Sequence, residues 1–163
     1  MDEPRWLTDG EQLVWRRFVQ VLITIPAALE AQLNRDAGLT HMGYIVLFTL
    51  SEQDGRRMAM SRLAKLASAS LSRLSHVVAR LEANGWIQRE RDRVDGRVQI
   101  AVLTDAGYAK LVETAPGHAE AVQQLVFDRL SPTQVRQLAR LCDSFLTNPV
   151  EVKPPLTGGV PAT

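Results

Sequence analysis

The stretch that decides the fold runs from Leu71 to Thr104 and reads LSRLSHVVARLEANGWIQRERDRVDGRVQIAVLT. Its first half repeats apolar residues every three or four positions, which predicts a helix with one buried stripe. The stripe consists of Leu71, Leu74, Val78 and Leu81. Asn84 and Gly85 end the helix, because a glycine there readily adopts the left-handed conformation that caps the last carbonyl groups.

The second half of the stretch changes to a strand pattern. Segments 86–91 and 98–103 are rich in β-branched and aliphatic residues, and segment 92–96 between them has turn chemistry, so we expect a β-hairpin with a charged tip. A short helical pattern precedes the stretch and is separated from it by a polar turn at 67–70; it carries Met60, Leu63, Ala64 and Leu66. Two short helices, a tight turn and a hairpin indicate a winged helix-turn-helix.

Two helices are predicted before this unit. Apolar residues recur with helical spacing from Thr8 to about Asn34, which indicates one long helix. Because proline lacks an N–H group and clashes with the preceding turn, we expect a kink or a break near Pro26. Thr40 is a typical N-cap for a second helix that ends before the turn residues at 54 and 55.

Two more helices are predicted after the hairpin. The first begins at Thr104, and its apolar stripe is interrupted at Pro116-Gly117. The second follows Ser131-Pro132-Thr133-Gln134, in which a serine N-cap, an early proline and a glutamine three residues on form a capping box, and it extends through Leu146. These helices and the first one carry more apolar surface than a core of about 90 residues covers, which predicts a homodimer.

The composition and the charge distribution narrow the class of protein. Apolar residues make up 45% and charged residues 23% of the chain, which is ordinary for a globular domain. Ten basic and four acidic residues lie between Arg56 and Arg97, a net charge of +6, whereas the remaining nine basic and fourteen acidic residues give −5. This asymmetry is typical of a segment that meets a polyanion such as DNA, although a solvated mixed surface is an alternative.

The sequence also indicates the compartment. The chain has one cysteine, no secretory leader pattern and no apolar run long enough to span a membrane, so we expect a cytoplasmic protein. Cys142 lies beside Leu141 and Phe145 in the last predicted helix, and we interpret it as a buried, inert thiol rather than as a redox sensor.

No constellation of residues indicates an enzyme. The three histidines, His41, His76 and His118, lack metal-ligand spacing, so no metal or other cofactor is expected. No phosphate-binding loop or nucleophile elbow is present, and Asp92 with Asp95 is better explained by the hairpin turn than by paired acid and base groups.

The order of elements and the hairpin resemble the MarR family of bacterial transcription regulators. Asp95-Gly96-Arg97, a following strand that ends in Leu103-Thr104, and the preceding LEANGW at 81–86 carry this resemblance, which covers about 8–146. It implies a mainly α fold with a small β-hairpin wing. Residues 1–148 would form a single domain, with the winged helix-turn-helix at about 40–104 and dimerisation helices at about 8–34 and 104–147. The proline- and glycine-rich tail, 149–163, is expected to be disordered.

The resemblance also implies how the wing meets DNA. Arg97 would enter the minor groove, and Asp95 would orient its guanidinium through a bidentate pair, while Arg93 adds positive charge to the tip. The tip departs from the family at Gly96, where a second basic residue is common, and at 93–94, where proline is frequent.

The second helix of the helix-turn-helix, which follows the turn at 67–70, is the recognition helix, and its outer face is predicted to meet the major groove. Its polar residues are Ser70, Ser72, Arg73, Ser75 and His76. Arginine can bind guanine O6 and N7 together, and Arg80, one turn further along, suits a phosphate.

The function implied is a homodimeric, sequence-specific regulator, a repressor that binds a pseudo-palindromic operator and is released by a small effector. Anionic aromatic compounds are common effectors in the family, and Trp15, His41 and Tyr44 are candidates to line such a pocket, although aromatic residues at helical spacing also serve as ordinary core. An architectural or protein-interaction module without operator specificity is the alternative.

Overall fold

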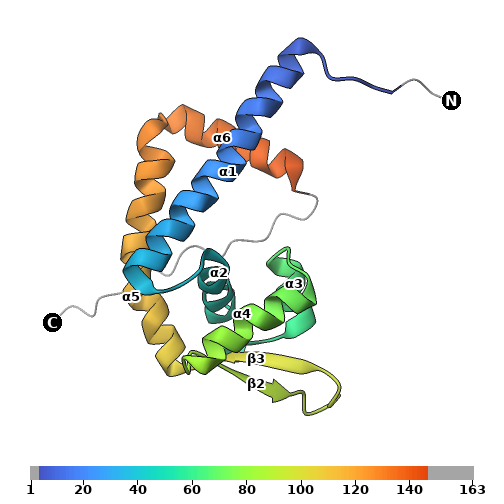
Figure 1. Cartoon of the computed structure of the whole chain (residues 1–163), viewed down its shortest axis with the longest axis vertical. Helices are drawn as coiled ribbons and strands as arrows, with labels where there is room; N and C mark the ends of the chain where they lie inside the picture. Colours follow the sequence, from blue (N-terminus) through green and yellow to red (C-terminus); the bar gives the residue numbers. More distant parts are fainter. Residues whose placement is uncertain (1–3, 147–163) are drawn as a thin grey trace.

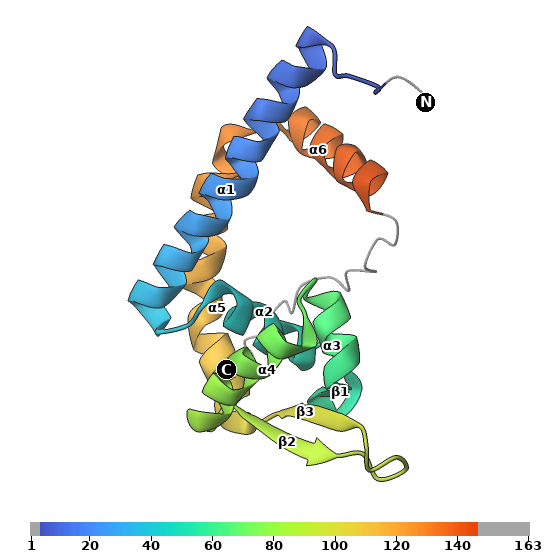
Figure 2. The ribbon, with the colours of Figure 1, turned by 45° about the vertical axis from the view of Figure 1, so that its right-hand side comes forward.

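The computed structural model describes residues 4–146, so the tail predicted to be disordered lies outside the described residues. The elements are α1 (Asp9–Ala37), α2 (His41–Ser51), the 3-10 turn η1 (Asp54–Arg56), β1 (Arg57–Ala59), α3 (Met60–Leu66), α4 (Leu71–Ala83), β2 (Ile87–Arg91), β3 (Gln99–Leu103), α5 (Asp105–Leu125), the 3-10 turn η2 (Phe127–Arg129) and α6 (Pro132–Phe145). Helices α1 and α5 lie side by side, and the helix-turn-helix and the sheet form a lobe at one end of the pair (Figures 1 and 2).

Hydroxyl side chains begin the helices as their spacing predicts. Thr40 and Thr104 accept hydrogen bonds from the N–H groups of Gly43 and Gly107, each three residues on, which satisfies one of the free donors of the first turn. Ser131 forms the predicted capping box with Gln134. The same device, with Glu11 as partner, begins α1 at Thr8, although the sequence alone had indicated only the helix there.

The break that was one of the two outcomes expected near Pro26 is not present. Helix α1 runs through Pro26, and α5 likewise runs through Pro116, without a break. Both prolines are exposed, so the carbonyl group that each leaves unpaired one turn earlier stays accessible to water and the helix continues at moderate cost.

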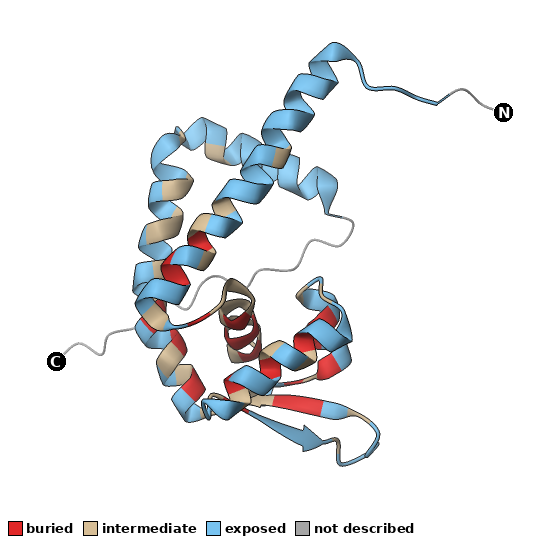
Figure 3. Ribbon diagram, in the orientation of Figure 1, coloured by how far each residue is buried: buried red, intermediate tan, exposed pale blue. Residues whose placement is uncertain are grey.

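The core lies in the helix-turn-helix lobe and where α1 and α5 meet it (Figure 3). Its fully buried side chains come from the end of α1, from α2, α3 and α4 and from the start of β2, and include Leu33, Val46, Leu47, Leu50, Leu63, Leu74, Val78 and Ile87. One residue of the predicted stripe is not buried: Leu71 is 52% exposed. It is the first residue of α4, and a helical side chain points toward the N-terminus of its helix, away from the core here.

The sheet has the order β1-β3-β2, with both pairs antiparallel. Strands β2 and β3 form the expected hairpin, in which Arg89 lies opposite Ala101. Strand β1 was not predicted, because a three-residue strand that leads directly into α3 carries neither alternation nor a turn signal of its own.

Helix α6 has no buried residue, and the ring of its Phe145 stacks on that of Phe18 in α1 at 5.6 Å between centroids. The prediction that Cys142 is buried is therefore wrong for the single chain, in which this thiol is exposed. Within residues 4–146, no helix is long and apolar enough to cross a membrane.

Candidate nucleic-acid interface

The predicted outer face of α4 is solvent-facing. Among its polar residues only Ser75 is half-buried; Ser70, Ser72, Arg73, His76 and Arg80 are exposed. Ser70 also has a structural role, because its Oγ accepts the backbone N–H of Arg73 at 3.2 Å and begins the helix. Its hydroxyl proton remains available to a phosphate or a base.

The turn into α4 is tightly determined. Helix α3 ends in a Schellman motif, in which the N–H of Ser68 donates to the carbonyl of Lys65 at 3.1 Å and that of Ala69 donates to Ala64 at 2.9 Å. Ser68 has a φ of 49°, in the left-handed region. This reversal sets the angle between α3 and α4.

The wing tip is organised by two aspartates. Asp92 Oδ1 accepts the N–H groups of Val94 at 2.8 Å and Asp95 at 3.0 Å, and these bonds, that from Asp95 first, lower the pKa of Asp92. Asp95 Oδ1 accepts the backbone N–H of Arg97 at 3.0 Å. The expected bidentate pair between Asp95 and the Arg97 guanidinium is therefore not the contact observed; Asp95 shapes the backbone that presents Arg97.

The root of the wing is joined to α5. Thr104 Oγ1 donates to the carbonyl of Gly85 at 2.7 Å, and the N–H of Thr104 donates to that of Trp86 at 3.1 Å. Gly107 packs so closely that an added Cβ would lie 2.1 Å from the Trp86 oxygen. The end of α4, the wing and the start of α5 therefore meet in one hydrogen-bonded junction.

The predicted contact surfaces carry free cations. Arg56, Arg57 and Arg89 form ion pairs with Asp105, Glu90 and Glu82. By contrast, Arg73, Arg80, Arg93 and Arg97 form no ion pair within residues 4–146 and are exposed. Their charges remain available to a polyanion.

The three candidate pocket residues are not brought together. His41 and Tyr44 lie near His118 of α5, with ring centroids 6.0 and 4.3 Å from that of His118. Trp15 instead contacts Phe18, and it lies on α1 about 22 Å before Glu30, which accepts the His41 N–H at 2.5 Å. His118 joins this cluster from far along the chain, and no local pattern in the sequence indicates that.

The aromatic cluster is partly shielded from water. Burial raises the pKa of Tyr44. Burial, and then the charge of His41, lower the pKa of His118, whose Nδ1 has no partner among the described atoms.

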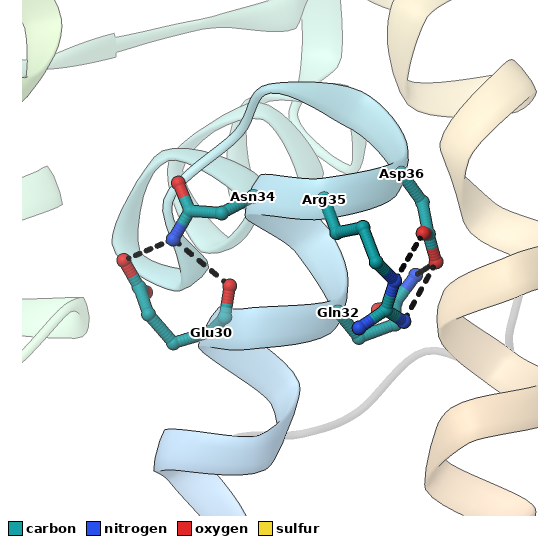
Figure 4. A network of polar contacts seen from close by, with 5 residues as sticks. All are labelled: Glu30, Gln32, Asn34, Arg35 and Asp36. Carbon is teal, nitrogen blue, oxygen red and sulfur yellow. Dashed lines mark hydrogen bonds and ion pairs between the residues drawn. The ribbon is translucent and has the colours of Figure 1, made fainter.

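The end of α1 beside this cluster is a polar network (Figure 4). Asn34 Nδ2 donates to the carboxylate of Glu30 at 3.0 Å, and Gln32 Nε2 donates to Asp36 at 3.0 Å. The Gln32 bond, more than the neighbouring Arg35, lowers the pKa of Asp36.

Known proteins share this architecture over most of the chain. Sco3205 of Streptomyces coelicolor is a MarR family transcriptional regulator whose crystal structure was solved in complex with DNA. It is 50% identical to this chain with a TM-score of 0.84, and the match covers 89% of this chain and 91% of that one. The chain belongs to the MarR family. The sequence model of another family, the transcriptional regulators SarA/Rot, matches residues 28–113.

Other relatives are more distant. AbsC of S. coelicolor is 37% identical with a TM-score of 0.81, over 87% of this chain and 95% of that one. The transcriptional repressor MprA of Escherichia coli K12 is 27% identical over 110 residues, which are 68% of this chain and 62% of MprA. The chain thus spans less than two thirds of the length of this curated relative. These relatives are regulators of transcription rather than enzymes.

Proposed function

We propose that the chain is a homodimeric, sequence-specific DNA-binding repressor that a small effector releases from its operator. The observation that carries the proposal is the pair of exposed, unpaired arginine surfaces, one on the outer face of α4 and one on the wing tip, held by a single junction. The relative solved in complex with DNA supports the same partner for this chain.

The two surfaces recognise different grooves of the DNA. Arg73, with Ser72, Ser75 and His76, reads base edges in the major groove, while Ser70 and Arg80 bind phosphates. Arg93 and Arg97 lie over the minor groove, where a narrow A·T-rich sequence concentrates negative potential. Leu71, which the sequence had assigned to the core, is exposed beside these residues and suits a thymine methyl group.

The dimer forms through α1, α5 and α6, and the winged helix-turn-helix at about 40–104 remains free for DNA. Large apolar side chains are exposed along the first half of α1 and along α6: Leu13, Val14, Trp15, Leu22, Leu141 and Phe145. A two-fold axis buries this surface against its copy and gives a pseudo-palindromic operator.

Release takes place at the junction of the dimerisation helices with the DNA-binding lobe. His41, Tyr44 and His118 offer two imidazoles and a phenol, which suit an anionic aromatic compound. Trp15 is too distant to share this site within one chain. An effector related to the 6-hydroxynicotinic acid that regulates BpsR of Bordetella bronchiseptica is a reasonable first ligand to test.

Selection of bound duplexes from a random-sequence DNA pool tests this proposal against an architectural or protein-interaction module. An operator-specific protein should enrich one palindromic sequence and bind it about 10³–10⁷-fold more tightly than random DNA. A pool that remains random after selection, or a ratio near one, would contradict operator recognition.

A further inference from the structure

The last turn of α4 is joined to the wing through one carboxylate. Glu82 Oε1 accepts the backbone N–H of Arg89 at 3.1 Å. Its Oε2 accepts Arg89 Nε at 2.8 Å and lies 2.5 Å from Arg89 Nη2 in an ion pair. One residue of the recognition helix thus accepts two hydrogen bonds from one residue of strand β2 and forms an ion pair with it, and we call this contact the Glu82–Arg89 clamp.

The clamp lies on the outer strand of the wing, which has little other support of its own. Strand β2 is at the edge of the sheet, so its side away from β3 has no partner strand among the described residues. Only Ile87 of β2 is buried; the rest of the strand is exposed. Beyond Ile87, therefore, no apolar packing of β2 fixes the wing against α4, and the clamp satisfies an N–H on the open edge.

The second ion pair of β2 does not reach α4. Glu90 binds Arg57 of β1 at 3.3 Å, so it ties the wing to its own sheet. The wing extends from the end of α4 toward its charged tip (Figure 2). Strand β3 is held by its pairing with β1 and by its buried Ile100 and Ala101, and the clamp adds a direct polar contact between the outer strand β2 and α4. A shift of β2 relative to α4 would move Arg97 relative to Arg73.

The clamp is formed at neutral pH. The side-chain bond from Arg89 is the largest cause that lowers the pKa of Glu82. About a third of each side chain remains exposed, so salt screens the pair in part.

We propose that Glu82 positions the wing for DNA binding, by fixing the spacing between the wing tip and the recognition helix through the Glu82–Arg89 clamp. The inference rests on the proposed function, in which one operator is contacted by both surfaces at once. Glu82 itself lies on the side of α4 that faces the wing, and it acts through Arg97 rather than on DNA.

The test compares Glu82→Gln with Glu90→Gln in the full chain. Each variant removes one negative charge beside the wing and one ion pair, so their general effect on DNA attraction is matched. The probe is the duplex that the wild-type protein enriches from a random pool. We expect Glu82→Gln to weaken binding about three- to tenfold, and Glu90→Gln to bind as well as the wild type or slightly better.

Two further measurements separate positioning from a general loss of structure. In an Arg97→Ala background, Glu82→Gln should cost less than about twofold, because there is no longer a wing arginine to position. Without DNA, ¹⁵N relaxation should show lower order parameters for residues 92–98 in Glu82→Gln but not in Glu90→Gln.

Two kinds of result would contradict the positioning role of Glu82, and they differ in what they imply for the proposed function. Additive losses in the double variant, or an unchanged wing mobility in Glu82→Gln, would overturn the positioning role while leaving the proposed function intact. If Arg97→Ala alone bound the duplex normally, the wing contact itself would be wrong, and the positioning role would fall with it.

Discussion

The turn of the helix-turn-helix contains a residue with an unusual backbone conformation. Ser68 holds a left-handed φ of 49° at the end of α3, a conformation that costs a side-chain-bearing residue about 1–2 kcal/mol relative to glycine. Glycine also gains freedom in the unfolded chain, so we predict that Ser68→Gly stabilises the protein by a net of about 0.5–1 kcal/mol. Urea unfolding measures this, with Ala69→Gly, at an ordinary φ, as a destabilised control. A lower stability for Ser68→Gly would contradict the assigned turn.

His118 should make stability depend on pH. Its pKa lies below the ordinary value of 6.5, so on acidification the unfolded chain binds this proton before the folded chain does. Stability is therefore lost as pH falls below about 6.5 toward the folded pKa. We predict a smaller drop in melting temperature between about pH 8 and about pH 5 for His118→Gln than for the wild type. His76→Gln, an exposed histidine on α4, should leave the drop unchanged; equal drops for all three proteins would exclude His118.

At the scale of elements, the junction of wing and α5 depends on one glycine. A Cβ on Gly107 would meet the Trp86 oxygen at 2.1 Å and Leu103 Cδ1 at 2.7 Å. Because backbone must move to relieve this clash, we predict that Gly107→Ala destabilises the fold by about 2–3 kcal/mol or more. Gly10→Ala is the matched control, since nothing lies within 4 Å there and alanine favours the helix. A Gly107→Ala variant as stable as Gly10→Ala would contradict this close packing.

Elements whose signals are local could be predicted from the sequence. The hydroxyl caps at Thr40 and Ser131, the glycine after α4 and the turn chemistry at 92–96 each act within a few residues, and the structure has them as expected. Continuity through Pro26 could not be predicted, because the cost of a proline is local whereas the support for a long helix comes from its whole length.

In the candidate site, too, features with local sequence signals could be predicted and features that depend on packing could not. The exposed face of α4 follows from helical periodicity, so its polar residues were assignable. The meeting of His41, Tyr44 and His118 depends on how α2 packs on α5, which no spacing along the chain encodes. Within one chain Trp15 does not lie with them, because an aromatic residue on an apolar stripe does not reveal which partner covers it.

At the scale of the whole molecule, the single chain leaves a large apolar surface uncovered. Leu141 and Phe145 of α6 are 57% and 67% exposed, and Leu22 of α1 is 53% exposed. We predict a homodimer, so light scattering at micromolar concentration should give twice the chain mass of 18.1 kDa. Leu141→Asp with Phe145→Asp should lower the mass toward the monomer. A wild-type mass of 18.1 kDa would contradict the dimer.

In the proposed function, α4 reads the major groove of the operator while the wing reads the neighbouring minor groove. The most direct measurement is fluorescence anisotropy of Arg73→Ala, Arg97→Ala and Arg136→Ala on the selected duplex and on duplexes with altered flanks, with thermal melts alongside. Arg136 is the control, because it lies on α6 and donates to Thr133 within that helix at 3.0 Å. We predict that Arg73→Ala relaxes the preference at one major-groove position by about 1–3 kcal/mol, that Arg97→Ala weakens binding most on A·T-rich flanks, and that Arg136→Ala binds normally. Equal losses for all three variants, with unchanged melting temperatures, would contradict the assignment of α4 and the wing as the DNA-reading surfaces.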